Sequence, residues 1–261
     1  MPLPLTIIKV GGAVVEDEAR LNELLDGFCA ISGRKVLVHG GGRRATAIAS
    51  RLGIESTMVG GRRVTDRDML EVVTMVYGGL VNKNIVAQLQ ARGTDALGLT
   101  GADIDVIRSH KRPVKDVDYG FVGDVERADG DKLATLIEAG ITPVMAPLTH
   151  DGHGMLLNTN ADTIAAETAK ALAKRYDVTL VYCFEKKGVL ANPDDDDSVI
   201  PLITRADFAR LVADGTVAGG MLPKLENAFN AISAGVSRVN ITLATAIDGR
   251  HGYRALTLTR E

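Results

Sequence analysis

Residues 5–43 read LTIIKVGGAVVEDEARLNELLDGFCAISGRKVLVHGGGR, and this stretch decides the fold class. It contains two short apolar runs rich in β-branched residues, Leu5–Val10 and Val36–His39, separated by the amphipathic stretch Glu18–Ala30. A strand, a helix and a second strand in this order form one unit of a parallel sheet. Glycines follow each apolar run at once, so the turns after both strands can approach a ligand closely.

The same alternation continues along the chain. Further strand-like runs are Ala96–Leu99, Thr142–Met145, Val178–Tyr182, Val239–Leu243 and Ala255–Leu258, and further helical stretches are Arg44–Leu52, Thr65–Ala91, Lys132–Glu138, Asp162–Arg175, Asp207–Val212 and Leu225–Ala234. Two other segments, Thr57–Val64 and Val106–Val125, have the pattern of antiparallel hairpins. We therefore expect an α/β protein with a mostly parallel central sheet, helices on both faces in a three-layer αβα sandwich, and antiparallel hairpin flaps.

The chain has no Ser/Pro-rich linker, so we expect a single domain over residues 1–261. A weak division near residue 160 separates an N-terminal lobe of about 1–159 from a C-terminal lobe of about 160–261. We expect the two lobes to share one continuous sheet.

Composition excludes several classes of function. The net charge of −3 gives no reason to expect nucleic acid or an anionic membrane as a partner. No stretch is long and apolar enough to cross a bilayer, and the N-terminus lacks the pattern of a signal peptide. The two cysteines, Cys29 and Cys183, lie in apolar surroundings typical of a reducing compartment. We expect a cytoplasmic protein.

Lysines beside glycine-rich turns indicate a phosphate site. Lys9 stands just before Gly11 and Gly12, and Gly40 to Gly42 follow the second strand. Glycines let backbone N–H groups approach an anion, although a strand-to-helix turn often needs glycine for geometry alone. Lys224 follows Gly219-Gly220 at the start of a helix, where the helix dipole disfavours a cation. That mismatch favours a bound anion.

Two further motifs carry polar residues. Arg62 and Arg63 follow Gly60-Gly61, and a guanidinium can bind a carboxylate through two parallel hydrogen bonds, although a surface arginine pair would look the same. In the segment 157–162, LNTNAD, helix capping accounts for Asn160 and Asp162 but not for Asn158.

Two other nucleotide-binding folds fit less well. Residues 40–45, GGGRRA, match a permissive dinucleotide pattern, but they follow the second strand, and no acidic residue ends the next strand to hold a ribose. The G-x-x-x-x-G-K-[ST] pattern of a P-loop does not occur in the chain.

Taken in order and spacing, these motifs resemble the N-acetylglutamate kinases of the amino-acid kinase family. The motifs that carry the resemblance are residues 9–12 (KVGG), 39–42 (HGGG), 61–65 (GRRVT), 158–162 (NTNAD) and 219–224 (GGMLPK). The resemblance implies the amino-acid-kinase fold, an N-terminal lobe that binds the acylglutamate and forms the dimer, and a C-terminal lobe that binds ATP. It implies phosphorylation of the side-chain carboxylate of N-acetyl-L-glutamate by ATP in arginine biosynthesis.

The resemblance also implies roles for individual residues. Lys9 and Lys224 would neutralise charge on the transferring phosphoryl group, and Asp162 would hold both lysines. Arg63 and Asn158 would hold the α-carboxylate of the substrate. Backbone donors around the phosphoryl group and the attacking carboxylate would come from Gly11, Gly12, Gly41 and Gly42.

Two segments depart from the family pattern. Before the closing strand the family usually has Gly-Thr, whereas Tyr253 follows Gly252 here. The family usually ends a strand with a Thr-Asp pair where residues 182–189 of this chain read YCFEKKGV. We expect nucleotide contacts from Lys186, Gly188 and Gly220. For Lys186 and Lys187 two interpretations are equally open: one of them contacts the nucleotide, or both belong to a solvated charged turn.

The chemistry needs positive charge rather than a base. A carboxylate with a pKa of about 4.3 is ionised at neutral pH, so no histidine has to be catalytic. His39 is better interpreted as a residue that orients the glycine turn. We expect Mg²⁺ to arrive with ATP, held by phosphates and water, and we expect no metal site made by the protein alone.

Three hypotheses remain open: an N-acetylglutamate kinase; a kinase for N-succinylglutamate or another anionic acceptor such as uridylate or carbamate; and a small-molecule sensor without catalysis. We expect a homodimer, because the helix predicted from Thr65 to Ala91, with a capping box at Thr65 and Asp68, is apolar on more than one face and carries Gly78-Gly79 at mid-length.

Overall fold

The computed structural model describes residues 2–184, 188–192, 194–195, 197–217, 221–247 and 256–258. Within them, the main sheet has eight strands in the order β12-β14-β13-β11-β1-β2-β8-β5. Their bounds are β1 (Leu3–Val10), β2 (Arg34–His39), β5 (Ala96–Leu99), β8 (Thr142–Met145), β11 (Tyr176–Phe184), β12 (Leu202–Ile203), β13 (Arg238–Leu243) and β14 (Leu256–Leu258). All neighbours are parallel except β13 and β14, so the mostly parallel sheet is confirmed.

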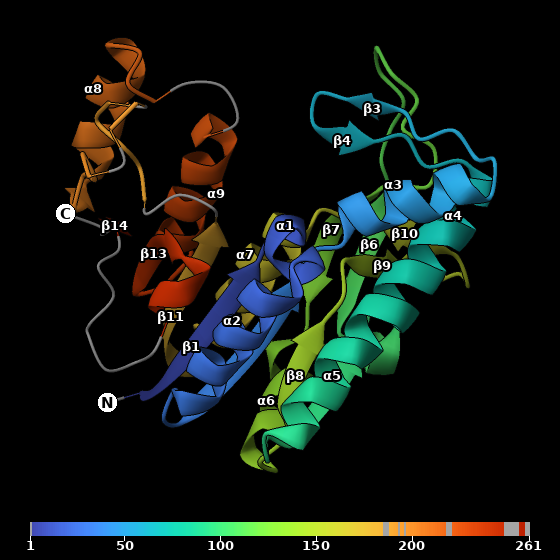
Figure 1. Cartoon of the computed structure of the whole chain (residues 1–261), viewed down its shortest axis with the longest axis horizontal. Helices are drawn as coiled ribbons and strands as arrows, with labels where there is room; N and C mark the ends of the chain where they lie inside the picture. The colour runs from blue at the N-terminus through green and yellow to red at the C-terminus, as the bar shows by residue number, and fades with distance from the viewer. Residues whose placement is uncertain are drawn as a thin grey trace.

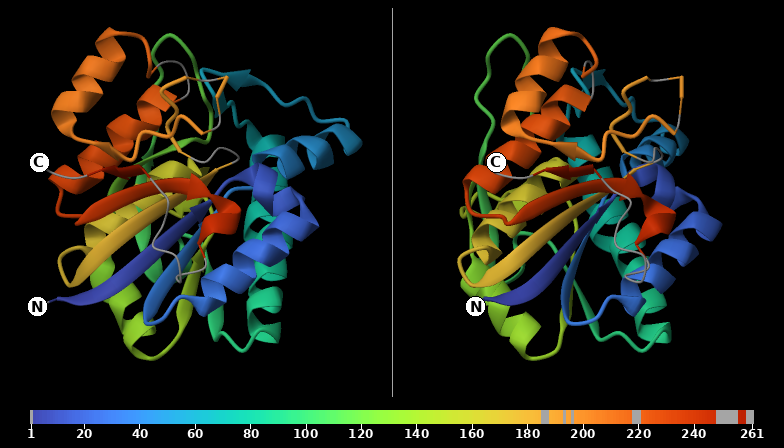
Figure 2. Two further views of the ribbon diagram at one scale, coloured as in Figure 1. Left: turned by 60° about the vertical axis from the view of Figure 1, so that its left-hand side comes forward. Right: turned by 90° about the vertical axis from the view of Figure 1, so that its left-hand side faces the viewer.

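Helices cover both faces of this sheet (Figures 1 and 2). One apolar core lies under the helical segments α1 (Gly12–Glu16), α2 (Glu18–Ala30), α3 (Gly42–Arg51), α4 (Arg67–Val73), η1 (Thr74–Val81) and α5 (Asn82–Ala91). The other lies under α6 (Gly130–Glu138), α7 (Ala161–Leu172), α8 (Arg205–Ala213) and α9 (Leu222–Ser233). Short 3₁₀ turns occur at η2 (Asp103–Asp105) and η4 (Ala244–Ala246). The three-layer sandwich is confirmed.

The two hairpin flaps are also confirmed. Strands β3 (Met58–Val59) and β4 (Arg62–Arg63) form an antiparallel pair that projects past α3 in Figure 1. The second flap, β6 (Ile107–Lys111) and β7 (Gly123–Ala128), belongs to a four-stranded sheet of order β10-β9-β6-β7. The added strands β9 (Leu148–His150) and β10 (Leu156–Asn158) are absent from the sequence prediction.

The helix predicted from Thr65 to Ala91 is confirmed as one unbroken helical run, α4, η1 and α5, but its predicted start and its capping box at Thr65 are wrong. The helix begins at Arg67, and Asp66 is its N-cap, accepting a hydrogen bond from the backbone N–H of Met69 at 2.8 Å. Thr65 cannot serve as the cap because its hydroxyl donates to the carbonyl of Arg63 and accepts from the side chain of Asn158. The middle of the segment, η1, is a π-helix of eight residues, a form that is rare outside functional sites.

The sheet joins the two lobes at its centre. Strand β1 lies between β2 of the N-terminal lobe and β11 of the C-terminal lobe, and both pairings are parallel. The expected continuous sheet is therefore confirmed. The carboxyl ends of these three strands meet at one edge, which is where open α/β sheets bind ligands.

Across the described ranges, the structure contains no helix with the length and hydropathy needed to cross a bilayer.

Candidate functional site

The turns after β1 and β2 pack directly against each other. The N–H of Gly40 donates to the carbonyl of Val10 at 3.0 Å. A Cβ atom on Gly40 would lie 3.1 Å from the nitrogen of Gly12, and one on Gly12 would lie 3.6 Å from the nitrogens of Gly41 and Gly42. A side chain at Gly40 would push against the backbone of the neighbouring turn, whereas one at Gly12 would make an ordinary contact. The glycines therefore allow the starts of α1 and α3 to share one small space.

Gly41 has a second constraint that comes from η1. A Cβ atom at this position would lie 2.9 Å from Cδ1 of Tyr77, which is closer than real carbon contacts. Tyr77 is 5% exposed, and burial raises the pKa of its hydroxyl. The sequence interpretation missed Tyr77, because its apolar helix gave no signal that one side chain faces a cavity.

A buried histidine supports the same turn. In His39, Nδ1 lies 2.8 Å from the carbonyl oxygen of Gly40, and Nε2 lies 3.0 Å from Nδ2 of Asn82. The amide of Asn82 donates, so the histidine carries its proton on Nδ1 and donates to Gly40. Burial lowers the pKa of His39 to about 4, which keeps the ring neutral at physiological pH. The interpretation of His39 as a residue that orients the glycine turn is supported by these contacts.

Lys9 and Asp162 form a buried ion pair. The Nζ atom of Lys9 lies 2.5 Å from Oδ1 of Asp162, and the two side chains are 8% and 17% exposed. Lys9 is the penultimate residue of β1, and Asp162 lies in the first turn of α7. The side chain of Asn160 caps that helix by accepting from the N–H groups of Asp162 and Thr163 at 2.7 and 3.2 Å. The predicted cap at Asn160 is confirmed.

Lys224 lies near this pair. It lies in the first turn of α9, and its Nζ atom is 3.9 Å from the ring centroid of Phe184. The Nζ atom of Lys9 is 5.3 Å from the same centroid. A cavity of about 550 Å³ brings both lysines together with Asp162, Gly11 and the residues Gly12, Ala13, Val14, Gly42, Arg43, Thr46, Met58, Arg63, Cys183, Phe184 and Met221.

The charges and the thiol in this cavity suit an anionic ligand. Asp162 is the sole carboxylate among the described residues that line it, and Lys9 already pairs with that carboxylate. Desolvation raises the pKa of the Cys183 thiol to about 12, so it stays protonated and is a poor nucleophile. What remains is positive charge and backbone N–H groups, which is the donor set for phosphates.

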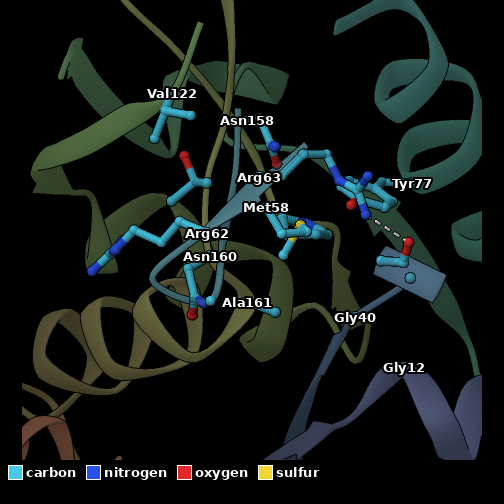
Figure 3. A pocket seen from close by; sticks show the side chains of 15 residues that line it. Gly12, Gly40, Met58, Arg62, Arg63, Tyr77, Val122, Asn158, Asn160 and Ala161 are labelled. Carbon is cyan, nitrogen blue, oxygen red and sulfur yellow. Dashed lines mark hydrogen bonds between the residues drawn. The ribbon is translucent and has the colours of Figure 1, made fainter. Parts of the chain in front are cut away.

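A smaller cavity of about 190 Å³ adjoins the first one (Figure 3). Gly12, Gly42 and Arg63 line both cavities. The smaller one also contains Gly41, Tyr77 and Asn158, and its remaining lining residues are Gly40, Met58, Gly61, Arg62, Val122, Pro147, Thr159, Asn160 and Ala161. The smaller cavity thus brings together all four predicted substrate-binding residues, Gly41, Gly42, Arg63 and Asn158.

Arg63 is held in place by the protein. Its Nη2 atom donates to the carbonyl of Gly42 at 2.8 Å, shown as a dashed line in Figure 3, and to the hydroxyl of Thr46 at 2.9 Å. Its Nη1 atom donates to the hydroxyl of Ser56. The side chain is 7% exposed, so its charge is buried beside the glycine turn. The guanidinium therefore fixes Gly42 as well as lining the cavity.

Asn158 also lines the smaller cavity. Its side-chain amide donates to the hydroxyl of Thr65 at 2.9 Å, and its backbone N–H donates to the carbonyl of Phe121 at 2.9 Å. These bonds fix the side chain while its carbonyl oxygen is in no hydrogen bond found among the described residues.

Of Lys186, Gly188 and Gly220, which were predicted to contact the nucleotide, only Gly188 is among the described residues. Lys186 and Gly220 lie outside the described residues, as does Lys187. Gly188 is described and buried, and neither cavity includes it among its described lining residues. Phe184 lines the larger cavity although the sequence indicated only a departure from the family pattern there.

Known proteins resemble this chain over most of its length. The model of the amino acid kinase family matches residues 4–242. An acetylglutamate kinase of Bacteroides thetaiotaomicron is 71% identical over 250 residues, covering 96% of this chain and 97% of that protein. One of Cytophaga hutchinsonii is 54% identical over 244 residues, covering 93% and 92%.

The structural comparison concerns the fold alone. The N-acetylglutamate synthase of Neisseria gonorrhoeae, solved with coenzyme A and N-acetylglutamate, superimposes with a TM-score of 0.82 at 21% identity. The match covers 98% of this chain and 59% of the synthase.

Proposed function

This chain belongs to the amino acid kinase family, and we propose that it transfers the γ-phosphoryl group of ATP to the side-chain carboxylate of N-acetyl-L-glutamate. The products are ADP and N-acetylglutamyl 5-phosphate, in the biosynthesis of arginine. The chain is a kinase. It is 71% and 70% identical to two Bacteroides acetylglutamate kinases, over nearly their full length.

One observation carries the assignment of the site. Gly12, Gly42 and Arg63 line both cavities, so two ligands in these cavities would meet at the glycine turns. The larger cavity supplies two lysines and suits the phosphates of ATP. The smaller one supplies Arg63 and Asn158 and suits a dicarboxylic acceptor. This arrangement supports direct transfer between the two substrates.

The transfer step needs no proton. An oxygen of the ionised side-chain carboxylate attacks the γ-phosphorus, and the bond from that phosphorus to the bridging oxygen of ADP breaks. Because the carboxylate is already ionised, the reaction needs no general base. The neutral His39 is hydrogen-bonded to Gly40 and is not required as one. The barrier comes from repulsion among a carboxylate and several phosphate charges.

Lys9 and Lys224 would lower that barrier. Their ammonium groups approach the larger cavity from opposite lobes, and positive groups fixed in advance stabilise charge on the transferring group without reorganisation. Asp162 holds Lys9 at 2.5 Å. The N–H groups of Gly11, Gly12, Gly41 and Gly42 would act as further donors at the same place. Lys186, Gly188 and Gly220 remain proposed contacts for the nucleotide.

Arg63 and Asn158 would bind the α-carboxylate of the acceptor. Arg63 keeps its charge buried beside the smaller cavity, and a carboxylate there would neutralise it. The α-carboxylate does not change during the reaction, so this contact serves binding rather than catalysis.

Mg²⁺ would accompany the nucleotide. Among the described residues, the larger cavity has one carboxylate, already paired with a lysine, and no cluster of three or more acidic, histidine or cysteine residues occurs. Phosphate oxygens and water would supply the remaining ligands. When bound, the ion offsets charge on the phosphates.

We propose a cytoplasmic homodimer that uses η1 at its interface. Two apolar side chains of η1, Met75 and Leu80, are 56% and 40% exposed, whereas Val76, Tyr77 and Val81 pack into the core. A Cβ atom on Gly79 would meet no atom within 4 Å, so a second helix could approach there closely. Cys29 and Cys183 are free thiols, which suits a reducing compartment.

An acceptor with a longer, charged acyl group is a second candidate. Arg62 extends away from Arg63, as Figure 3 shows, and lines both the smaller cavity and a separate one of about 590 Å³ that also contains Arg112 and Lys115. Desolvation and the neighbouring Arg112 lower the pKa of Arg62. Among the described residues, the side chain of Arg62 has no hydrogen bond or ion pair, so it could meet the terminal carboxylate of N-succinylglutamate.

The function is tested by measuring ADP release with a panel of acceptors and trapping the acyl phosphate with hydroxylamine. We expect ADP and hydroxamate in equal amounts with N-acetylglutamate, and neither with uridylate or carbamate. Arg62→Ala separates the acyl candidates: a selective loss of kcat/KM with N-succinylglutamate would favour the charged acyl group. Binding of acceptor without any ADP release would instead indicate a sensor.

A further inference from the structure

Phe184 occupies an unusual place for an aromatic residue, because it faces two cations at once. It is the last residue of β11, and its ring stacks on that of Tyr182 with centroids 6.1 Å apart and an angle of 8° between the planes. The hydroxyl of Tyr182 donates to the carbonyl of Asp162 at 3.4 Å. The ring of Phe184 therefore stacks on a side chain that is hydrogen-bonded to α7.

Both lysines of the larger cavity lie within cation–π distance of this ring. The Nζ atom of Lys224 is 3.9 Å from the centroid, and that of Lys9 is 5.3 Å away. An ammonium group within about 6 Å of an aromatic face is attracted to the negative side of the ring quadrupole. One uncharged side chain thus attracts two positive groups that come from β1 and from α9.

The π face of Phe184 adds no negative charge to this cavity. Lys9 has Asp162 at 2.5 Å, which offsets one positive charge. The ring attracts the ammonium groups through its quadrupole and does not offset their charge, so it leaves them available to an anionic ligand. It also counters the dipole of α9, whose N-terminus disfavours a lysine in the first turn.

We propose that Phe184 is a positioning residue that holds the ammonium groups of Lys9 and Lys224 at the phosphate cavity by cation–π contact. The inference rests on the proposed function for its effect on turnover, but the contact itself is independent of turnover. Phe184 forms no bond with the substrates. It fixes the positions of the two ammonium groups before the nucleotide binds.

The test compares three variants. Phe184→Leu removes the π face but keeps an apolar side chain, and Phe184→Tyr keeps the face. Phe208→Leu is the matched control, since Phe208 packs at a tilt against Phe229 with centroids 5.2 Å apart and lines neither cavity in the described residues. Thermal unfolding of each variant shows whether it folds.

The first readout needs no activity. Competitive acetylation across a pH series, followed by mass spectrometry of the peptide with Lys224, gives the pKa of that amine separately from its accessibility. Cation–π contact stabilises the charged form, so Phe184→Leu should lower this pKa, and Phe184→Tyr and Phe208→Leu should leave it as in the wild type.

The second readout is steady-state kinetics with ATP and N-acetylglutamate. We expect Phe184→Leu to lower kcat about tenfold with a smaller change in KM, because mispositioned charges stabilise the transition state less. Phe184→Tyr should restore kcat to within about threefold. An unchanged pKa of Lys224 in folded Phe184→Leu would overturn the inference. A wild-type protein without acceptor-dependent ADP release would overturn the proposed function and leave the pKa result standing.

Discussion

The amino group of Lys9 lies 2.5 Å from Oδ1 of Asp162, and this contact ties the central strand β1 to the first turn of α7. Both side chains are mostly excluded from solvent. A buried charge without its partner is strongly destabilising, typically by about 3–5 kcal/mol, so the two residues depend on each other. The pair faces the larger cavity, where the proposed transfer occurs.

Asp162→Asn should impair both stability and turnover. The amide keeps the shape of the carboxylate but leaves Lys9 without a counter-charge, so we expect a lower melting temperature and a fall in kcat of about 10²-fold. Asp131→Asn is a suitable control, because Asp131 is an exposed acid paired with Arg175. Wild-type turnover in Asp162→Asn would remove this residue from the proposed mechanism.

Arg63→Ala should act mainly on acceptor binding. We expect KM for N-acetylglutamate to rise strongly and KM for ATP to rise weakly, because the α-carboxylate is bound equally in the ground and transition states. The variant also leaves the carbonyl of Gly42 without its donor, so some loss of stability should accompany it.

The matched control for Arg63 is Arg175→Ala, which removes an exposed arginine that lines neither cavity in the described residues. Initial-rate kinetics with each substrate varied in turn provide the measurement. A rise in KM for ATP alone would mean that Arg63 serves the nucleotide instead.

His39 makes stability depend on pH in a defined window. Burial lowers its pKa to about 4 in the folded protein, whereas the unfolded chain has the ordinary value of about 6.5. The unfolded state then binds more protons between these values, so the contribution of His39 to stability is present above pH 6.5 and is lost as the pH falls toward 4.

The pH effect of His39 can be isolated by substitution. His39→Gln removes the titration, so its melting temperature should fall less than that of the wild type between pH 6.5 and 4. His153→Gln, which alters an exposed histidine, should follow the wild type. Parallel pH profiles for His39→Gln and the wild type would contradict a neutral buried His39.

The proposed interface predicts a change of mass on substitution. Leu80→Glu places a charge on the exposed side of η1, where a second subunit would have to bury it, so we expect a dimeric wild type and a monomeric variant by light scattering at micromolar concentration. Leu52→Glu, at a side chain that is 57% exposed at the end of α3, should remain dimeric. A monomeric wild type would reject the proposal.

Much of the fold could be predicted from local patterns. The helix α2 and the strands β5 and β8 match the expected bounds, because their apolar periodicity and flanking glycines act locally. The start of α4 could not be predicted in this way. Its apparent cap, Thr65, is drawn into bonds with Arg63 and Asn158, which are partners from other elements.

The site residues divide in the same way: some can be predicted from the local sequence, and others depend on contacts with distant parts of the chain. Lysines and glycines at strand ends are visible in the sequence because the chemistry requires those residue types there. Tyr77 and Phe184 are not, since a ring that faces a cavity and a ring that packs in the core follow the same apolar pattern. Asn82 is missed for a related reason: its contact with His39 joins positions 43 residues apart.

Lys224→Ala provides the most direct test of the central claim that two lysines from opposite lobes stabilise the transferring phosphoryl group. Loss of a contact made mainly in the transition state should lower kcat by roughly 10²–10⁴-fold and alter both KM values less. The measurement is ADP release at saturating ATP and N-acetylglutamate by the folded variant beside the wild type. A kcat within about twofold of the wild-type value would contradict the account, because no catalytic charge in the larger cavity could then come from Lys224.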